Sequence, residues 1–137
     1  MTASERFLAG ETLTWDEVAS ILQAYNSLPR FATIKQANLK NGWLVRYWLS
    51  KEFDVRSGTP YVRYAEFSSE NEAISFVGTI KANKWEGCQL LANNDYYIAE
   101  SSCDYKGDYC DIKFYTGDEG VNFLAFCANK VVENENV

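Results

Sequence analysis

The chain has 137 residues, of which 47% are hydrophobic, 15% aromatic and 23% charged, with a net charge of −6 and no histidine. This composition excludes extensive disorder and suits one folded domain over residues 1–132, followed by a frayed acidic tail over residues 133–137. No apolar stretch approaches the roughly 20 residues that cross a bilayer, and the amino terminus lacks a signal-peptide pattern, so we expect a cytoplasmic protein without a membrane partner.

The first half of the chain predicts a helix followed by three strands. Thr14, with Glu17 three residues later, has the spacing of a capping box, and the helix after it should end near Asn26. The expected buried face of this helix comprises Trp15, Val18, Ile21, Leu22 and Tyr25. The pair Asn41-Gly42 favours a two-residue hairpin turn. The three expected strands are residues 31–38, 43–53 and 61–67, with a second turn at residues 57–60.

The second half predicts another helix and four strands. Ser69 and Glu72 repeat the capping pattern, and the apolar residues of the expected buried helix face are Ala73, Ile74, Phe76, Val77 and Ile80. The expected strands are residues 85–92, 96–103, 109–115 and 121–128, with turns at 93–95 and 116–120. Because nearly all connections are short, we expect an α+β single domain. It would contain a curved, mostly antiparallel sheet of about six or seven strands with two main helices packed on one face.

The charged residues are distributed unevenly along the chain. Residues 30–64 contain seven basic and two acidic residues, whereas residues 95–120 contain seven acidic and two basic residues. Such asymmetry favours recognition of a macromolecule. In the strand expected at 109–115, alternation assigns Cys110, Ile112 and Phe114 to an inner face and the remaining residues to a solvated face. The expected binding surface for a larger protein with a basic surface comprises Glu100, Asp104, Tyr105, Asp108, Tyr109, Asp111 and Tyr115.

The leading interpretation is a small, non-enzymatic, intracellular binding protein that inhibits or adapts a larger partner. Phage anti-defence proteins and bacterial immunity proteins share this size and charge, which is an association and not a motif match. A simpler reading of the acidic segment is a solvated sheet edge whose charges oppose aggregation. Without histidine, a Gly-rich phosphate loop or a nucleophile beside a base, nothing indicates catalysis, and no pattern indicates a cofactor.

The basic segment provides an alternative face for a ligand or for single-stranded nucleic acid. Its residues combine phosphate-binding and base-stacking side chains: Arg46, Trp48, Arg56, Arg63 and Tyr64. The net negative charge opposes binding of a polyanion, and strand alternation should bury part of the aromatic side chains. A further alternative is a module for a small molecule or a nucleotide, with an aromatic-lined pocket.

The four cysteines lack the paired spacing of a structural zinc site. If residues 105–108 form a hairpin loop, Cys103 and Cys110 lie opposite each other, within reach of a disulfide. Inside a cell we expect them to be reduced thiols. Asp104, Asp108 and Asp111 could supply oxygen ligands to a cation, but their spacing does not match a calcium-binding EF-hand loop, so no metal is expected.

Overall fold

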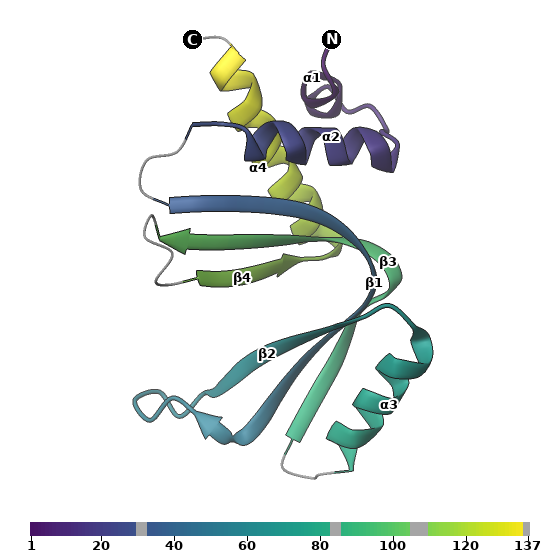
Figure 1. Cartoon of the computed structure of the whole chain (residues 1–137), viewed down its shortest axis with the longest axis vertical. Coiled ribbons are helices and arrows are strands. Elements are labelled where there is room, and N and C mark those ends of the chain that lie inside the picture. Colours follow the sequence, from purple (N-terminus) through teal and green to yellow (C-terminus); the bar gives the residue numbers. More distant parts are fainter. Residues whose placement is uncertain (30–32, 83–85, 105–109, 136–137) are drawn as a thin grey trace. The chain divides into compact units, whose positions relative to one another are not determined.

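The computed structural model describes residues 1–29, 33–82, 86–104 and 110–135, with the description limited to the backbone at residues 33, 34, 50, 51, 86, 104 and 110. Within these ranges the fold is α+β, with four helices and a four-stranded sheet in the order β2-β1-β3-β4 (Figure 1). The helices are α1 (Ala3–Leu8), α2 (Trp15–Asn26), α3 (Glu70–Lys81) and α4 (Gly117–Glu135). The strands are β1 (Thr33–Phe53), β2 (Pro60–Phe67), β3 (Glu86–Asp104) and β4 (Cys110–Tyr115).

The α+β class is confirmed, whereas the described residues form four strands instead of six or seven. Two of the expected hairpin turns lie inside long strands: β1 continues through Gly42 and β3 continues through Asn94. These two residues have positive φ, 153° for Gly42 and 57° for Asn94. Glycine and asparagine adopt positive φ both in a hairpin turn and at an irregularity within a strand, so the local signal could not distinguish the two.

The expected strand at residues 121–128 is wrong, because these residues belong to α4. The buried residues of α4 are Phe123, Leu124, Cys127, Ala128 and Val131, a spacing that places them along one helical face. A short apolar run is compatible with a buried strand or a buried helix face, and the short connections favoured the strand. Residues 133–135, which were expected to fray, continue α4.

Helix α1 was not anticipated, although the sequence carries its signal. Thr2 and Glu5 form a complete capping box, as do Thr14 and Glu17 at the start of α2. Arg6 of α1 also forms an ion pair with Glu17. A search for this pattern from the first residue onward would have found the helix.

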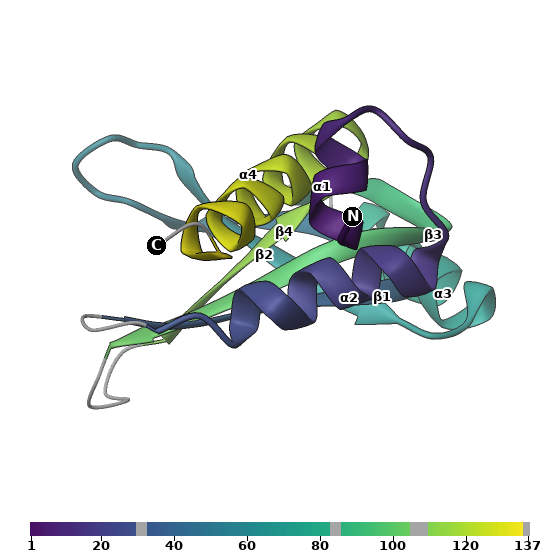
Figure 2. The same cartoon turned by 90° about the horizontal axis from the view of Figure 1, so that it is seen from above.

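The chain divides into two compact units, residues 1–40 with 97–137, and residues 41–96. In the first unit, α1, α2 and α4 lie on one face of the strands (Figures 1 and 2). The expectation was two main helices on one face, whereas the described residues of this unit alone form three. The extent of a single domain over residues 1–132 stays a prediction. In the described part of the chain, no helix combines the length and the apolar character that crossing a bilayer requires.

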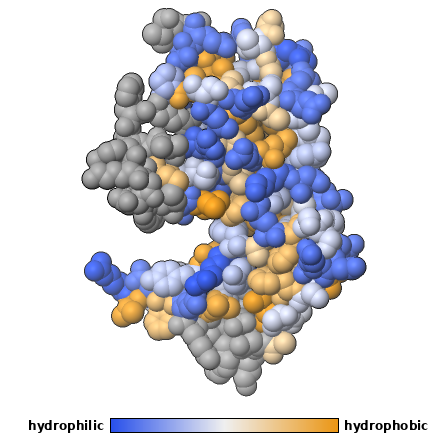
Figure 3. Space-filling view, viewed as in Figure 1, coloured by the Kyte–Doolittle hydropathy of each residue, from blue (hydrophilic) through white to orange (hydrophobic). Residues whose placement is uncertain are grey.

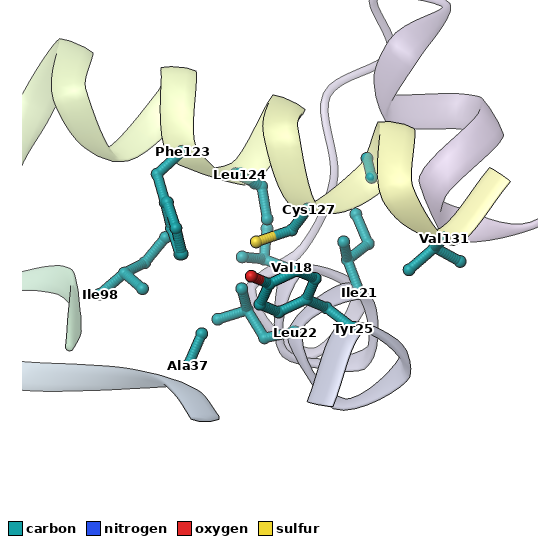
Figure 4. Packing of buried hydrophobic residues seen from close by; sticks show 11 residues of the cluster. Val18, Ile21, Leu22, Tyr25, Ala37, Ile98, Phe123, Leu124, Cys127 and Val131 are labelled. Atoms are coloured by element: carbon teal, nitrogen blue, oxygen red, sulfur yellow. The ribbon is translucent and has the colours of Figure 1, made fainter. Parts of the chain in front are cut away.

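The core of the first unit joins α2 and α4 to the sheet. Val18, Ile21, Leu22 and Tyr25 of α2 are buried as expected, whereas Trp15 is exposed. The cluster is completed by Ala37, Ile98, Phe123, Leu124, Cys127, Ala128 and Val131 (Figure 4). These contacts make α2 and α4 the main cover of this part of the sheet.

In the second unit, β1 pairs antiparallel with β2, and Phe76 of α3 packs against two aromatic rings of these strands. The ring centroid of Phe76 lies 4.9 Å from that of Tyr47 and 5.2 Å from that of Phe67. Ala73 and Ile80 are buried, as expected for the inner face of α3. Ile74 was assigned to the same face but is 60% exposed, so α3 presents an apolar side chain away from the core.

Candidate functional site

An open groove with a volume of about 320 Å³ lies beside α3 in the unit of residues 41–96. One wall is a stripe along α3 consisting of Glu70, Ala73, Ile74, Val77 and Lys81. The other wall and the floor come from strands β1 and β3 and comprise Trp43, Cys88, Leu90 and Asn93. The helix stripe has the spacing of one helical face, so the groove follows the length of α3.

The apolar walls of the groove remain open to solvent. Ile74 is 60% exposed and Leu90 is 45% exposed, although both are large aliphatic residues. Apolar residues reach the surface among polar ones over α3 (Figure 3). Helix geometry explains the position of Ile74: Phe76 and Ile80 face the sheet, and a residue two positions before Phe76 is rotated by about 160° from it. Neighbouring apolar side chains without cover are typical of interaction sites.

The polar groups of the groove are few. The indole Nε1 of Trp43 donates a hydrogen bond to Oδ1 of Asn93 at 2.7 Å, which holds the aromatic ring against the floor. Glu70 and Lys81 stand in the first and last turns of α3, about 16 Å apart along the helix axis. Each charge is opposite in sign to the partial charge of the helix dipole at its end, so both placements are favourable. The thiol of Cys88 is free and half-buried.

The acidic surface expected from the sequence is only partly described. Asp111 is exposed. Tyr105, Asp108, Tyr109 and the side chain of Asp104 lie outside the described residues. Glu100 is only 5% exposed, so it cannot form part of a surface for docking a partner in this structure.

The face of β4 that the helices cover also differs from the expectation. Tyr115 lies opposite the core residue Ile98 and shares the helix-covered face with the buried Glu100, whereas Lys113, opposite Glu100, is exposed. Ile112, which was expected on the inner face, is 53% exposed. The reason is that residues 121–128 form part of α4 and not a strand. This helix covers the face of β4 that was expected to be solvated.

Tyr115 is held between α4 and Glu100. Its ring stacks on Phe123 with 4.2 Å between the centroids, and its hydroxyl donates to Oε1 of Glu100 at 3.4 Å. Burial, with a further contribution from the charge of Glu100, raises the pKa of Tyr115 to about 12. The folded state therefore favours the neutral phenol.

Tyr115 is expected to ionise at higher pH than an exposed tyrosine. Because its folded pKa lies above the reference value of 10.0, its contribution to stability is complete below pH 10 and is lost as the pH rises through about 12. In a spectrophotometric titration, the late step of the curve should contain one tyrosinate fewer in Tyr115→Phe than in the wild type, in which Tyr25 and Tyr97 are also buried. The control Tyr61→Phe removes an exposed phenol and should retain that step. An unchanged amplitude of the late step in Tyr115→Phe would contradict the assignment.

The expected position of Cys103 opposite Cys110 is confirmed. Cys103 lies directly opposite Cys110 in the β3–β4 register. Cys103 is disulfide-bonded, which differs from the expectation of reduced thiols, whereas Cys88 and Cys127 are free. Among the described residues, no three acidic or cysteine side chains gather closely enough to hold a metal ion.

The basic residues do not converge on one surface. Arg46 lies opposite Tyr64 in the β1–β2 ladder, and these two share a face with Trp48. Arg63 lies opposite Tyr47 and therefore belongs to the other face. Arg63 forms an ion pair with Glu52.

Arg46 and Trp48 contact other residues of the sheet, and Arg56 lies apart from them in a turn. Arg46 donates a hydrogen bond to Gln89. The Trp48 indole covers Gly87 so closely that a Cβ at this glycine would overlap the ring. Arg56 is exposed in the turn that follows Asp54. Arg46, Trp48 and Tyr64 share one face, but Arg63 lies on the other face and Arg56 in a turn. The three arginines therefore cannot contact one strand of phosphates from a single surface.

The groove beside α3 is thus the site with the most complete geometry. The sequence suggested a pocket between the sheet and a capped helix only as an alternative, and it assigned Ile74 and Val77 to the core. Comparison with protein-family models, with curated proteins and with solved structures gives no match to this chain.

Proposed function

We propose that this chain is a small, non-enzymatic binding protein whose groove beside α3 receives an apolar segment of a larger protein. The observation that carries the proposal is the pair of exposed aliphatic walls, Ile74 on α3 and Leu90 on β3. Covering both would remove apolar surface from water, the main favourable term in most protein association. Inhibition or adaptation of that partner, the role expected from the sequence, is part of this proposal.

A polymer segment suits the groove better than a small molecule. The volume of about 320 Å³ is near the lower limit of small-molecule pockets, which usually enclose most of their ligand. Here the wall residue Ile74 is 60% exposed, so the groove is open along its side. A segment that enters at one end and leaves at the other can use such a shape.

The charges at the two ends of the groove define the chemistry of the segment. Glu70 favours a basic residue at one end, and Lys81 favours an acidic residue about 16 Å away. Between them the wall residues Ala73, Ile74 and Val77 favour small or medium apolar side chains. The proposed occupant is therefore a short apolar segment with opposite charges at its two ends.

Selection of peptides tests this proposal. A phage-displayed library of random 12-residue peptides would be panned against the wild type, and the selected peptides measured against Ile74→Glu. We expect their affinity to fall at least 30-fold, which corresponds to about 2 kcal/mol, because a carboxylate in the apolar wall would be desolvated on binding.

The matched control is Ser75→Glu, which adds the same charge at the next residue of α3, at an exposed position that does not line the groove. Circular dichroism would verify that both variants fold. Peptides that bind wild type and Ser75→Glu alike but lose Ile74→Glu support the proposal. Failure to select any peptide, or equal affinity for both variants, would refute it.

A further inference from the structure

This inference rests on the proposed function. We infer that the partner segment binds as an additional β-strand on the open edge of β3, with alternate side chains directed into the groove. Such strand addition uses main-chain hydrogen bonds for affinity and side-chain pockets for specificity.

The first observation is the unpaired edge of β3. The sheet order places β3 between β1 and β4, but the ladder to β4 reaches only from Cys103 back to Ile98. Residues 87–93 of β3 therefore have β1 on one side, and among the described residues no strand lies on the other. The N–H and C=O groups along such an edge are a template for another strand.

The second observation is that this edge also forms a wall of the groove. Cys88 and Leu90 line the groove opposite α3. The alternate residues face away: Gly87 lies under the indole of Trp48, and Gln89 accepts a hydrogen bond from Arg46. Helix α3 packs against β1 and β2 through Phe76 and faces β3 across the groove. A strand added about 4.8 Å beyond β3 would continue this alternation and direct every second side chain at α3.

The third observation concerns length and direction. The stripe from Glu70 to Lys81 spans about 16 Å, the length of about five residues of β-strand. Helix α3 ends shortly before β3 begins, so the Lys81 end of the groove lies at the start of β3 (Figure 1). Antiparallel pairing is the more stable arrangement per residue, and a segment antiparallel to β3 has its carboxyl side near Lys81. The inferred partner is an extended segment with apolar residues at alternate positions and an acidic residue at its carboxyl end.

The test uses the tightest peptide from the selection described above. An alanine scan of this peptide should show affinity losses at every second position, because only those side chains enter the groove. Losses at every third or fourth position would show that the peptide binds as a helix and would overturn the inference. In that case the dependence on Ile74 would remain, so the proposed function would stand.

Backbone N-methylation provides an independent readout. Methylation at the peptide amides that face β3 should weaken binding by at least 10-fold, whereas methylation at the alternate amides should change it less than threefold. Amide hydrogen exchange of β3 residues 88–92 should slow in the complex. Tolerance of methylation at every position, or unchanged exchange in these residues, would overturn strand addition.

The direction of the segment is tested through Lys81. Lys81→Glu should reverse the preference at the carboxyl end of the peptide from an acidic to a basic residue. Lys113→Glu, at an exposed position outside the groove, is the charge-matched control and should leave the preference unchanged. An unchanged preference in Lys81→Glu would overturn the antiparallel orientation.

Discussion

Leu22→Ala is expected to lower the free energy of unfolding by about 2–5 kcal/mol. Leu22 is only 2% exposed and belongs to the cluster that joins α2 to α4 and the sheet (Figure 4). Truncation removes its transfer free energy and leaves a cavity that Ile21 and Cys127, both also buried, cannot fill without moving. Chemical denaturation followed by circular dichroism measures the loss.

Gln23→Ala is the control for this substitution. It removes side-chain atoms at the next residue of the same helix, at an exposed position, and should change the free energy of unfolding by no more than about 0.5 kcal/mol. A loss below about 1 kcal/mol for Leu22→Ala would contradict the tight packing of α2 against α4.

Gly42→Ala should cost about 3 kcal/mol of unfolding free energy, for two reasons that act together. Gly42 has φ 153°, a value that residues with a side chain rarely adopt. A Cβ at this position would also lie 2.7 Å from the backbone oxygen of Phe67, which the β1–β2 ladder holds in place. Because the obstructing atom belongs to the backbone, the strands would have to separate locally.

Gly78→Ala is the matched comparison, since the same change should there have the opposite sign. Gly78 lies within α3, and a Cβ at this position would meet no atom within 4 Å. Alanine should therefore stabilise the helix by about 1 kcal/mol. Equal effects at the two glycines in urea denaturation would contradict the close approach of Gly42 to β2.

Elements with local signals were predicted from the sequence. The capping residues Thr14 and Ser69 were identified with the correct start of α2 and α3, because a cap satisfies backbone groups within its own turn. Strand alternation was also expected, and the register of β1 places Arg46 and Tyr47 on opposite faces. Such features depend on residues close together in the chain, so the sequence alone is enough to define them.

The groove could be predicted only in part. One of its walls follows from the helical spacing of Ala73, Ile74 and Val77, which the sequence showed. The same spacing assigned Ile74 to the core, because periodicity gives the direction of a side chain but not what lies opposite it. Cys88 and Leu90 come from β3, whose place beside α3 depends on the order of strands in the sheet.

By itself, the sequence determined the α+β class, the two capped helices and the alternation along strands, since each arises from neighbouring residues. Tertiary structure decided whether Gly42 reverses the chain, whether residues 121–128 form a strand or part of α4, and which face of β4 is covered. It also left the edge of β3 beside the groove unpaired within the described residues. The physical reason is that φ preferences and apolar periodicity are local, whereas strand partners and covered faces depend on contacts between distant segments.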